Sequence, residues 1–316
     1  MAEFQEALKP FSFEQYSELF KDLFVMTRKN GIIEVRAHTN GGEPVWSFAM
    51  HRGIGQMLRY VGADPENEVM IFTSTGNNWF HTSLKAVEQG LGELDKGFNS
   101  EQELLKEKAY ARSTYDMQYL DGRQLHEGFF NDVRIPTIAA INGPGGHTSF
   151  GLFCDITICT EDSIFKDLHF SQGMPCGEGQ YLAMQTLIGL KRANYCSLMG
   201  EHIDAQTALE LGVVNEIIPR EDLMKRAWEI AERIMNRPRM TRRMTSEIMK
   251  QKWRNVFHDD YYMHYFSQCW ANAVEGYPKF HDLERLTYFN TVHEDDSRFQ
   301  IKGKKEYKPN FSQELV

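Results

Sequence analysis

The chain has 316 residues, 41% hydrophobic and 25% charged, and this ordinary globular composition argues against a disordered, fibrous or membrane protein. Its formal net charge of −9 opposes non-specific binding to nucleic acid, because such binding needs clustered Lys and Arg to neutralise phosphates. No apolar run reaches about 18 residues and the first residues lack the pattern of a secretory signal, so we expect a cytoplasmic protein without a membrane segment.

The first part of the chain predicts strands that alternate with helices. Residues 31–39 alternate like a strand, and residues 47–66 carry apolar side chains at helical spacing. Residues 68–76 form a β-branched apolar run that ends at a glycine, which is typical of a strand. This strand–helix–strand order predicts parallel crossovers in an α/β protein.

The same rhythm returns after a long helical stretch at 101–132. Residues 135–143 have the pattern of a buried strand, residues 151–155 are short and apolar, and residues 155–162 read as another strand. From residue 178 onward the pattern is mostly helical. The elements expected there are a helix at 205–212, a strand at 213–219, a helix at 221–237 and two further helices at 238–256 and 259–275.

Cofactor motifs are missing from the sequence. The five cysteines show no CxxC pairing, which favours reduced thiols over disulfides, and the histidines show no HxxxH or HExxH spacing. Neither a GxGxxG after a strand nor a GxxxxGK[ST] motif is present. We therefore expect no metal and no cofactor.

Four motifs carry a likeness to a known family: TSTGNNWFHTSL (73–84), IAAINGPGG (138–146), HFSQGMPCGEGQYLAMQTLIGLKRA (169–193) and LMGEHIDAQTALELGVVNEIIP (198–219). Together they resemble the enoyl-CoA hydratase/isomerase, or crotonase, superfamily. The likeness implies a crotonase (ClpP-like) fold of repeated β-β-α units, with C-terminal helices that form a homotrimer or a dimer of trimers. The expected segments are an N-terminal extension at 1–30, a crotonase spiral core at 31–220, a helical trimerisation region at 221–280 and a tail at 281–316.

The chain departs from this family at its two catalytic glutamates. A typical hydratase has one glutamate just after its glycine-rich loop and another at the start of the segment that here begins LHF. Ser149 and His169 stand in these places, so ordinary hydration of an enoyl thioester loses its acid and its base. Imidazole titrates near neutral pH, which makes His169 a candidate base. Without the family position, a histidine followed by an apolar residue is more often structural.

This replacement resembles the 6-oxocamphor hydrolase and β-diketone hydrolase branch of the superfamily. The branch pattern HF-x-x-G-x-x-x-G-[DE]-G is matched from His169 to Gly179, with Glu178 where the 6-oxocamphor enzyme has aspartate. A carboxylate that bonds one imidazole nitrogen fixes the tautomer and lets the other nitrogen accept a proton, and this is the role we expect for Glu178. A favourable charge at a helix start is the simpler reading of that residue.

Further positions follow from the same resemblance. The branch carries a tryptophan and a histidine in a VW…H segment, matched by Trp46 and His51, and a histidine in the glycine-rich loop, for which His147 is the nearest candidate. A late acidic position falls near Gln268, which weakens the case for a third carboxylate.

The family also implies an oxyanion hole of two backbone N–H groups, which map to about His81 and Gly146. By itself, the GPGG sequence there is only a turn signal. Aromatic side chains near these motifs are expected to line an apolar substrate pocket, although each is equally suited to ordinary core: Trp46, Trp79, Phe80 and Phe150.

The leading functional prediction is therefore a cofactor-independent hydrolase that cleaves a carbon–carbon bond of a small-molecule 1,3-diketone by a retro-Claisen reaction. His169 would activate water, and His147 or His51 would stabilise or protonate the enolate. The alternative is an enoyl-CoA hydratase/isomerase-type enzyme acting on an acyl-CoA thioester, with Glu178 as its sole carboxylate. A third reading is a catalytically silent oligomeric binding protein that keeps only the fold.

Overall fold

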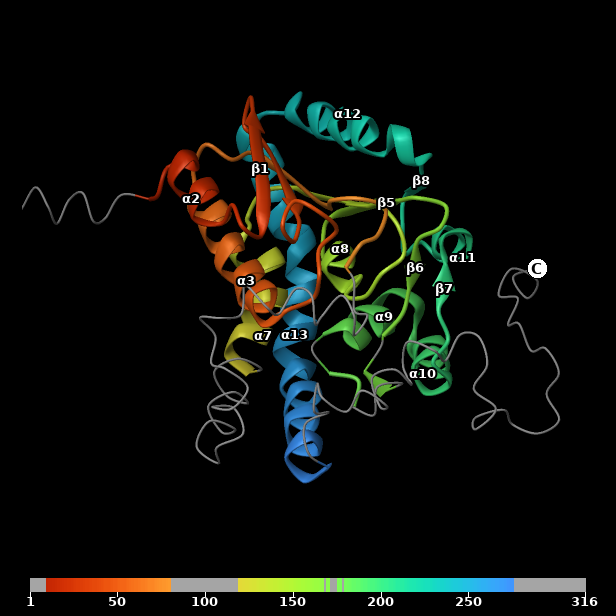
Figure 1. Ribbon diagram of the computed structural model, residues 1–316. Coiled ribbons are helices and arrows are strands. Elements are labelled where there is room, and N and C mark those ends of the chain that lie inside the picture. Colours follow the sequence, from red (N-terminus) through yellow and green to blue (C-terminus); the bar gives the residue numbers. More distant parts are fainter. Residues whose placement is uncertain (1–9, 81–118, 168, 171–174, 178, 276–316) are drawn as a thin grey trace, which may run out of the picture.

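The computed structural model describes residues 10–80, 119–167, 169–170, 175–177 and 179–275 (Figure 1). The strands are β1 Phe24–Lys29, β2 Ile32–Ala37, β3 Val69–Ser74, β4 Thr137–Ile141, β5 Ile156–Cys159, β6 Ile164–Phe165, β7 Ile203–Asp204 and β8 Glu216–Ile217. The α-helices are α2 Phe13–Leu19, α3 Phe48–Ala63, α7 Gly122–Glu127, α8 Ser149–Leu152, α9 Gln180–Ile188, α10 Leu190–Met199, α11 Ala205–Glu210, α12 Leu223–Met235 and α13 Arg239–Glu275. A π-helical turn, η3 Gly128–Asp132, follows α7, and a 3-10 turn, η5 Arg220–Asp222, precedes α12.

A sheet in the order β1-β2-β3-β4-β5-β8 forms the centre of the fold. β1 and β2 pair antiparallel, and each later neighbouring pair is parallel. β6 and β7 form a separate antiparallel pair. Parallel neighbours need a crossover, and α3 supplies it between β2 and β3. The predicted α/β class and the strand–helix–strand order of residues 31–76 are thus confirmed.

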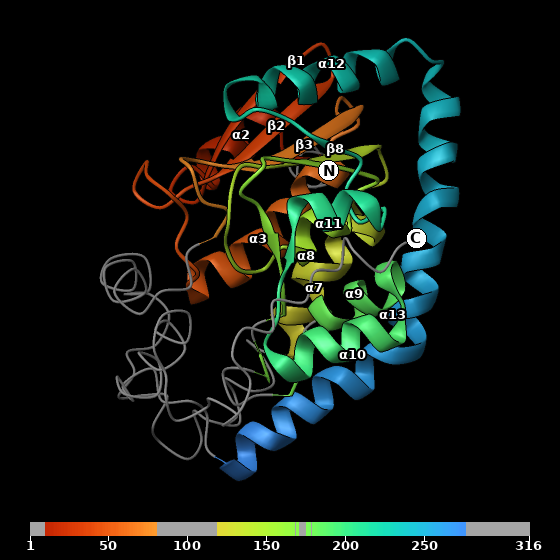
Figure 2. The same ribbon diagram turned by 90° about the vertical axis from the view of Figure 1, so that its right-hand side faces the viewer.

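Apolar side chains are buried on both faces of the sheet. On one face, Ile71 and Ile138 pack with Leu223, Ala227 and Ala231 of α12. The other face joins a larger core built with α3 and α8. Every residue of β3 is buried, as expected for a parallel strand that is covered on both sides. Figures 1 and 2 show α12 lying across the sheet and α13 running from there to the opposite end of the molecule.

The C-terminal helix corrects one prediction. Residues 238–256 and 259–275 were expected as two helices, but α13 is continuous over Arg239–Glu275. The stretch contains neither Gly nor Pro, so nothing in its backbone chemistry ends the helix at the Asp259–Asp260 pair. Neither α13 nor any other helix in the described ranges combines the length and apolarity needed to cross a bilayer.

Two shorter segments also differ from the expectation. Residues 149–152 form the short helix α8, and β5 begins only at Ile156. Within the expected N-terminal extension, α2 is capped by the Ser12 side chain and β1 pairs with β2, so this part of the chain forms an edge of the sheet. β1 and β2 form a hairpin whose paired residues are 3 to 13 positions apart, and this pairing, rather than the weak local pattern of β1, makes β1 a strand.

Polar contacts hold the loops that follow β3 and β4. Asn142 accepts a hydrogen bond from the Ser74 hydroxyl (2.6 Å) and donates to the Gly76 carbonyl (2.7 Å). Glu43 accepts hydrogen bonds from the Asn77 amide (2.8 Å) and the Asn78 side chain (3.0 Å). The carboxyl ends of parallel strands are the usual place for ligand sites. Here the hydrogen bonds of Asn142 join the end of β4 to the end of β3 and the loop that follows it.

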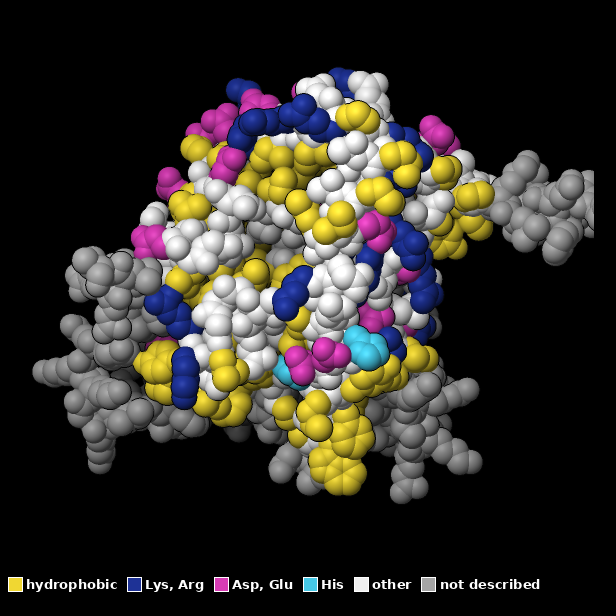
Figure 3. Space-filling view, turned by 180° about the vertical axis from the view of Figure 1, so that it is seen from behind, with side chains coloured by type: hydrophobic (Ala, Val, Ile, Leu, Met, Phe, Trp, Pro, Cys, Tyr) yellow, Lys and Arg dark blue, Asp and Glu magenta, His cyan; other side chains and the backbone are white. Residues whose placement is uncertain are grey.

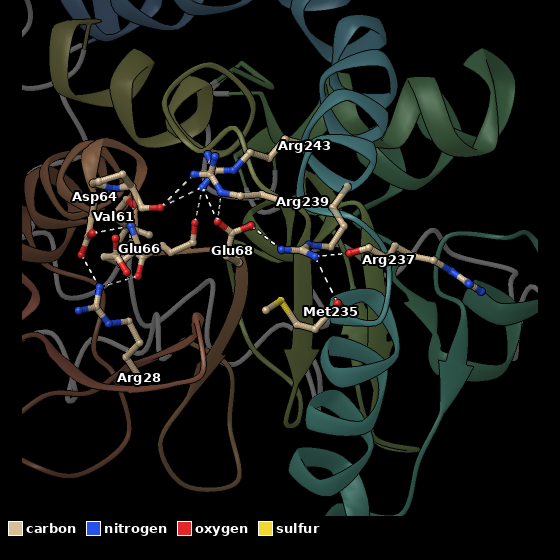
Figure 4. Close-up of polar contacts among 12 residues, drawn as sticks. Arg28, Val61, Asp64, Glu66, Glu68, Met235, Arg237, Arg239 and Arg243 are labelled. Carbon is tan, nitrogen blue, oxygen red and sulfur yellow. Dashed lines mark hydrogen bonds and ion pairs between the residues drawn. The ribbon is translucent and has the colours of Figure 1, made fainter.

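An arginine cluster ties the start of α13 to the sheet (Figure 4). Glu68, next to β3, accepts hydrogen bonds from Arg239 (2.6 Å), Arg242 (2.6 Å) and Arg243 (3.1 Å). Burial alone would raise the pKa of Glu68, but the three arginines lower it overall.

We expect Glu68→Gln to destabilise the fold by about 1–3 kcal/mol, because it removes charge-assisted hydrogen bonds. Since folding lowers the pKa of Glu68, its contribution is fully present above the ordinary value of 4.5 and is lost as the pH falls through the folded value. Urea unfolding at neutral and acidic pH should therefore show the difference between wild type and variant shrinking in acid. The exposed Glu66, changed to Gln, is the control; an equal loss from both variants would contradict the role of the cluster.

Candidate functional site

Histidine and aromatic rings form a cluster at the ends of β3 and β4. Trp46, from the loop before α3, stacks on the His147 ring with centroids 3.7 Å apart and planes at 25°. The ring of His51, on the first turn of α3, also packs on Trp46, with the two ring centroids 5.6 Å apart. Phe150 of α8 stacks on His147 at 5.6 Å and 8°, and Phe80 lies 5.7 Å from Phe150. The structure thus brings together five of the residues predicted for the site.

The backbone and side chain of His147 are both held. Its φ is +52°, a left-handed conformation that is uncommon outside glycine, although histidine is among the residues enriched there. The Trp79 indole N–H donates to the His147 carbonyl oxygen (3.2 Å). Gln180, the first residue of α9, approaches the ring with its Nε2 3.5 Å from His147 Nδ1. Trp79 is fully buried and packs on Phe72, and its indole supports the His147 backbone; its expected place in the lining of a substrate pocket stays a prediction.

Gly146 lies where the sequence predicted, but its amide is already used. The Gly146 N–H donates to the Phe80 carbonyl oxygen at 2.9 Å, which joins the two loops. This N–H is therefore paired within the protein, and its expected role in an oxyanion hole stays a prediction. The family position could be read from the sequence, whereas the pairing of the two loops could not.

Gly145 allows the same two loops to approach. A Cβ at this position would lie 2.6 Å from the Phe80 nitrogen and 2.9 Å from the Trp79 Cβ. We expect Gly145→Ala to cost about 1–3 kcal/mol of unfolding free energy, since backbone atoms must shift. Gly42→Ala is the matched control, because its Cβ would meet only the Thr39 oxygen at 3.6 Å. Thermal unfolding of both variants measures the difference, and a Gly145→Ala protein as stable as the control would refute the close approach.

His169 pairs with a carboxylate that the sequence analysis did not single out. Its Nδ1 lies 2.8 Å from Asp167 Oδ1, and its backbone N–H donates to the same oxygen at 2.8 Å. Both side chains are almost completely buried. Asp167 is therefore placed to orient the imidazole through Nδ1, whereas Glu178, for which an orienting role was expected, lies outside the described residues. The available signal was an Asp-x-His spacing directly after a strand, which is short enough for one carboxylate to reach both groups.

The surroundings of Asp167 are polar and enclosed. Burial raises the pKa of the Cys176 thiol to about 12, and the charge of Asp167 acts in the same direction. Burial also lowers the pKa of His264 on α13, against the opposing influence of Asp260 and Asp167. The Tyr181 ring lies 5.9 Å from the His264 ring. Cys176 and His264 thus lie close enough to Asp167 for its charge to affect their pKa values.

The start of α9 joins the two groups of residues. Gln180 contacts His147, and the ring of the next residue, Tyr181, lies 5.9 Å from the His264 ring, so the first two residues of this helix contact the aromatic cluster and α13. A Cβ on Gly179 would come within 3.4 Å of the His126 ring. His126 is fully buried and its Nδ1 bonds the Gly122 carbonyl oxygen at 2.8 Å.

Several predicted positions need separate mention. His81 and Glu178 lie outside the described residues. Gln268 lies beside Gly177, where a Cβ would come within 2.0 Å of its Oε1, so the late helix position does face this segment. Ser149 is fully buried, and its hydroxyl has no hydrogen-bond partner within the part of the chain that the structure describes. Within the described parts of the chain, no three His, Cys, Asp or Glu side chains are grouped closely enough to hold a metal ion.

Comparison with known proteins relates this geometry to a family. Hydroxycinnamoyl-CoA hydratase-lyase of Pseudomonas fluorescens is 28% identical over 193 residues, which are 60% of this chain and 64% of that protein. Carnitinyl-CoA dehydratase of Salmonella heidelberg is 27% identical over 67% of this chain and 74% of its own length. The chain thus spans slightly less than two thirds of the first of these curated relatives.

Two solved structures share the fold. A β-diketone hydrolase from the cyanobacterium Anabaena, bound to (S)-3-oxocyclohexyl acetic acid, matches with a TM-score of 0.68 and 26% identity, over 84% of this chain and 97% of that one. An enoyl-CoA hydratase/isomerase from Mycobacterium paratuberculosis matches with a TM-score of 0.68 and 20% identity, over 82% and 97% of the two chains. The family profile described as enoyl-CoA hydratase/isomerase matches residues 28–268. Since this match covers most of the chain, the protein belongs to the enoyl-CoA hydratase/isomerase family, within the crotonase superfamily.

Proposed function

We propose that the protein is a cofactor-independent hydrolase that cleaves a carbon–carbon bond of a 1,3-diketone by a retro-Claisen reaction. The observation that carries this proposal is the buried contact between His169 Nδ1 and Asp167 Oδ1, at the position where hydratases have a glutamate. A carboxylate at Nδ1 holds the proton on that nitrogen and leaves Nε2 to act as a base. The likeness to the Anabaena β-diketone hydrolase supports the same reaction class.

The reaction would proceed in two chemical steps. His169 Nε2 removes a proton from water, and the hydroxide adds to one carbonyl carbon of the diketone to give a tetrahedral oxyanion. The oxyanion then collapses: its carbon–carbon bond breaks, a carboxylic acid forms, and the bonding electrons leave as an enolate that the second carbonyl stabilises. The proton held by His169 is returned to the enolate carbon, so water is the only co-reactant.

The remaining site residues stabilise the negative charge of the intermediates and bind the substrate. The enolate and the oxyanion both need hydrogen-bond donors, and His147, His51 and the His81 amide are the donors proposed here. Trp46, Phe80 and Phe150 supply apolar surface beside His147, which suits a substrate with a carbon ring. Glu178 is proposed as a second acidic group of the site.

A panel of cyclic and linear β-diketones, assayed beside crotonyl-CoA, tests this function. Consumption of a diketone with release of a keto acid is the expected result. Hydration of the thioester without any diketone cleavage would overturn the proposal.

The acyl-CoA alternative is favoured by the curated relatives, whose names specify CoA substrates. In this alternative a carboxylate of the site transfers the proton. Glu178 was the expected carboxylate, and Asp167 is a second candidate. Calorimetric titration with free coenzyme A separates the two functions. Tight binding would support the alternative, whereas absence of binding together with diketone turnover supports the hydrolase.

We also propose that the protein assembles as a homotrimer or a dimer of trimers. One face of α13 exposes apolar side chains at helical spacing, and Figure 3 shows hydrophobic side chains gathered where this helix ends. The large hydrophobic residues exposed on α13 are Met240, Met244, Ile248, Met249, Tyr262, Met263, Phe266 and Trp270. Such a surface is typical of a subunit contact. Light scattering that gives the mass of one chain would refute this assembly.

A further inference from the structure

The family likeness does not account for the side chain of Gln180 at the start of α9. It is 2% exposed, and among the described residues its Oε1 has no hydrogen-bond partner. Burying a carbonyl oxygen without a hydrogen-bond partner costs stability, because the oxygen loses its hydration. A less polar residue at the start of α9 would avoid this cost, so the carboxamide has a reason to be there that lies outside the packing of the helix.

The other end of the carboxamide faces His147. Its Nε2 lies 3.5 Å from His147 Nδ1. The distance is at the long limit of a hydrogen bond, so the contact contributes direction more than energy. An amide N–H can only donate, and it therefore favours the neutral imidazole in which Nδ1 is the acceptor and Nε2 carries the proton.

The rest of the environment keeps the imidazole from turning away from this contact. Trp46 covers one face of the ring at 3.7 Å, and Phe150 stacks on it at 5.6 Å with planes only 8° apart. The left-handed backbone at φ +52° and the hydrogen bond from the Trp79 indole to the His147 carbonyl hold the main chain. A ring fixed in this way presents its two nitrogens in constant directions.

We propose that Gln180 is a positioning residue that fixes His147 as the Nε2–H tautomer, so that His147 serves the reaction as a hydrogen-bond donor and not as a base. This inference rests on the proposed function, because the recipient of the donated hydrogen bond is the oxyanion or the enolate. It divides the work of the two histidines: Asp167 holds the proton on Nδ1 of His169 and makes Nε2 a base, whereas Gln180 holds the proton on Nε2 of His147 and makes it a donor. Opposite tautomers at the two sites thus give opposite roles.

The tautomer can be measured without any substrate. In protein labelled with ¹⁵N-histidine, long-range proton–nitrogen correlation distinguishes a protonated Nε2 from a protonated Nδ1, and the His147 signal is assigned by its loss in His147→Gln. We expect Nε2 to be the protonated nitrogen in the wild type. Protonation at Nδ1 in the neutral ring would overturn the proposal, since Gln180 would then accept through Oε1.

Gln180→Glu is the decisive variant. A carboxylate accepts instead of donating, so it should move the proton to Nδ1 and raise the pKa of His147. Because a protonated imidazole quenches the fluorescence of a stacked indole, the difference in fluorescence between each protein and its Trp46→Phe counterpart reports this titration. The midpoint should shift to higher pH in Gln180→Glu and stay at the wild-type value in Gln251→Glu, which adds the same charge at an exposed position of α13. An unshifted midpoint in Gln180→Glu would refute the inference.

Activity supplies a separate readout. With the diketone substrate, kcat of Gln180→Glu should fall by about 10²-fold at neutral pH with KM little changed, as for the loss of one oxyanion donor. Gln180→Met, which keeps the bulk but imposes no tautomer, should fall less. If no diketone is cleaved by the wild type while the spectra show Nε2–H, the reaction assignment fails and the tautomer assignment stands. If diketone is cleaved but the ring carries its proton on Nδ1, only the role of Gln180 fails.

Discussion

Replacing His169 by Ala should lower kcat for diketone cleavage by about 10²–10⁴-fold, the usual contribution of a general base. The base acts in the transition state, so kcat and kcat/KM should fall together while KM changes little. Steady-state kinetics on the diketone identified by the substrate panel measures the effect. Because His169 is buried, His169→Gln is the second variant: it retains most of the volume and a group that can contact Asp167, but it offers no base.

The controls for this experiment lie in the same chain. His258→Ala removes a histidine that also contacts an aspartate, Asp259 at 3.1 Å, but on the exposed surface, and it should leave kcat unchanged. Asp167→Asn should lower kcat as well, because an asparagine amide can donate to Nδ1 and thereby place the proton on Nε2. Turnover near the wild-type value in a folded His169→Gln protein would exclude His169 as the base.

Removing the buried Lys250 should have the largest effect on stability. Its ammonium, which is completely buried, donates to the Val133 carbonyl oxygen (2.8 Å) and the Ile135 carbonyl oxygen, and it lies 3.4 Å from Asp155 Oδ2. These contacts attach the middle of α13 to the segment that leads into β4. Burial lowers the pKa of Lys250, and the charge of Asp155 opposes this effect.

We expect Lys250→Met to reduce the free energy of unfolding by about 3–5 kcal/mol, because it leaves a carboxylate and two carbonyl groups without their cation. Urea unfolding at fixed protein concentration measures the loss. Adding Asp155→Asn removes the uncompensated charge, so the double variant should lose less than the sum of the two single changes. Lys252→Met on the exposed face of α13 is the matched control, and a Lys250→Met protein as stable as this control would contradict the prediction.

Local patterns were sufficient for the elements that carry the fold. The run EVMIFTSTG specified β3 because a strand buried on both faces must be continuously apolar, and Gly62 and Pro65 marked the end of α3 within a few residues. The family likeness, which depends on short motifs at the ends of these elements, supplied the superfamily that the profile match confirms. By contrast, β1 depends on its pairing with β2, which its own local pattern does not show.

Sequence patterns alone predicted which residue types occupy the site: Ser149 and His169 at the two positions of the hydratase glutamates, and aromatic residues near the glycine-rich loop. Only the tertiary structure decided which groups touch. Asp167, two residues before His169, contacts the imidazole at Nδ1, and the Phe80 carbonyl oxygen accepts a hydrogen bond from the Gly146 amide. The physical reason is that hydrogen bonds require a particular direction and a separation near 3 Å, and in a loop these follow from backbone geometry and from neighbours that are distant in the sequence.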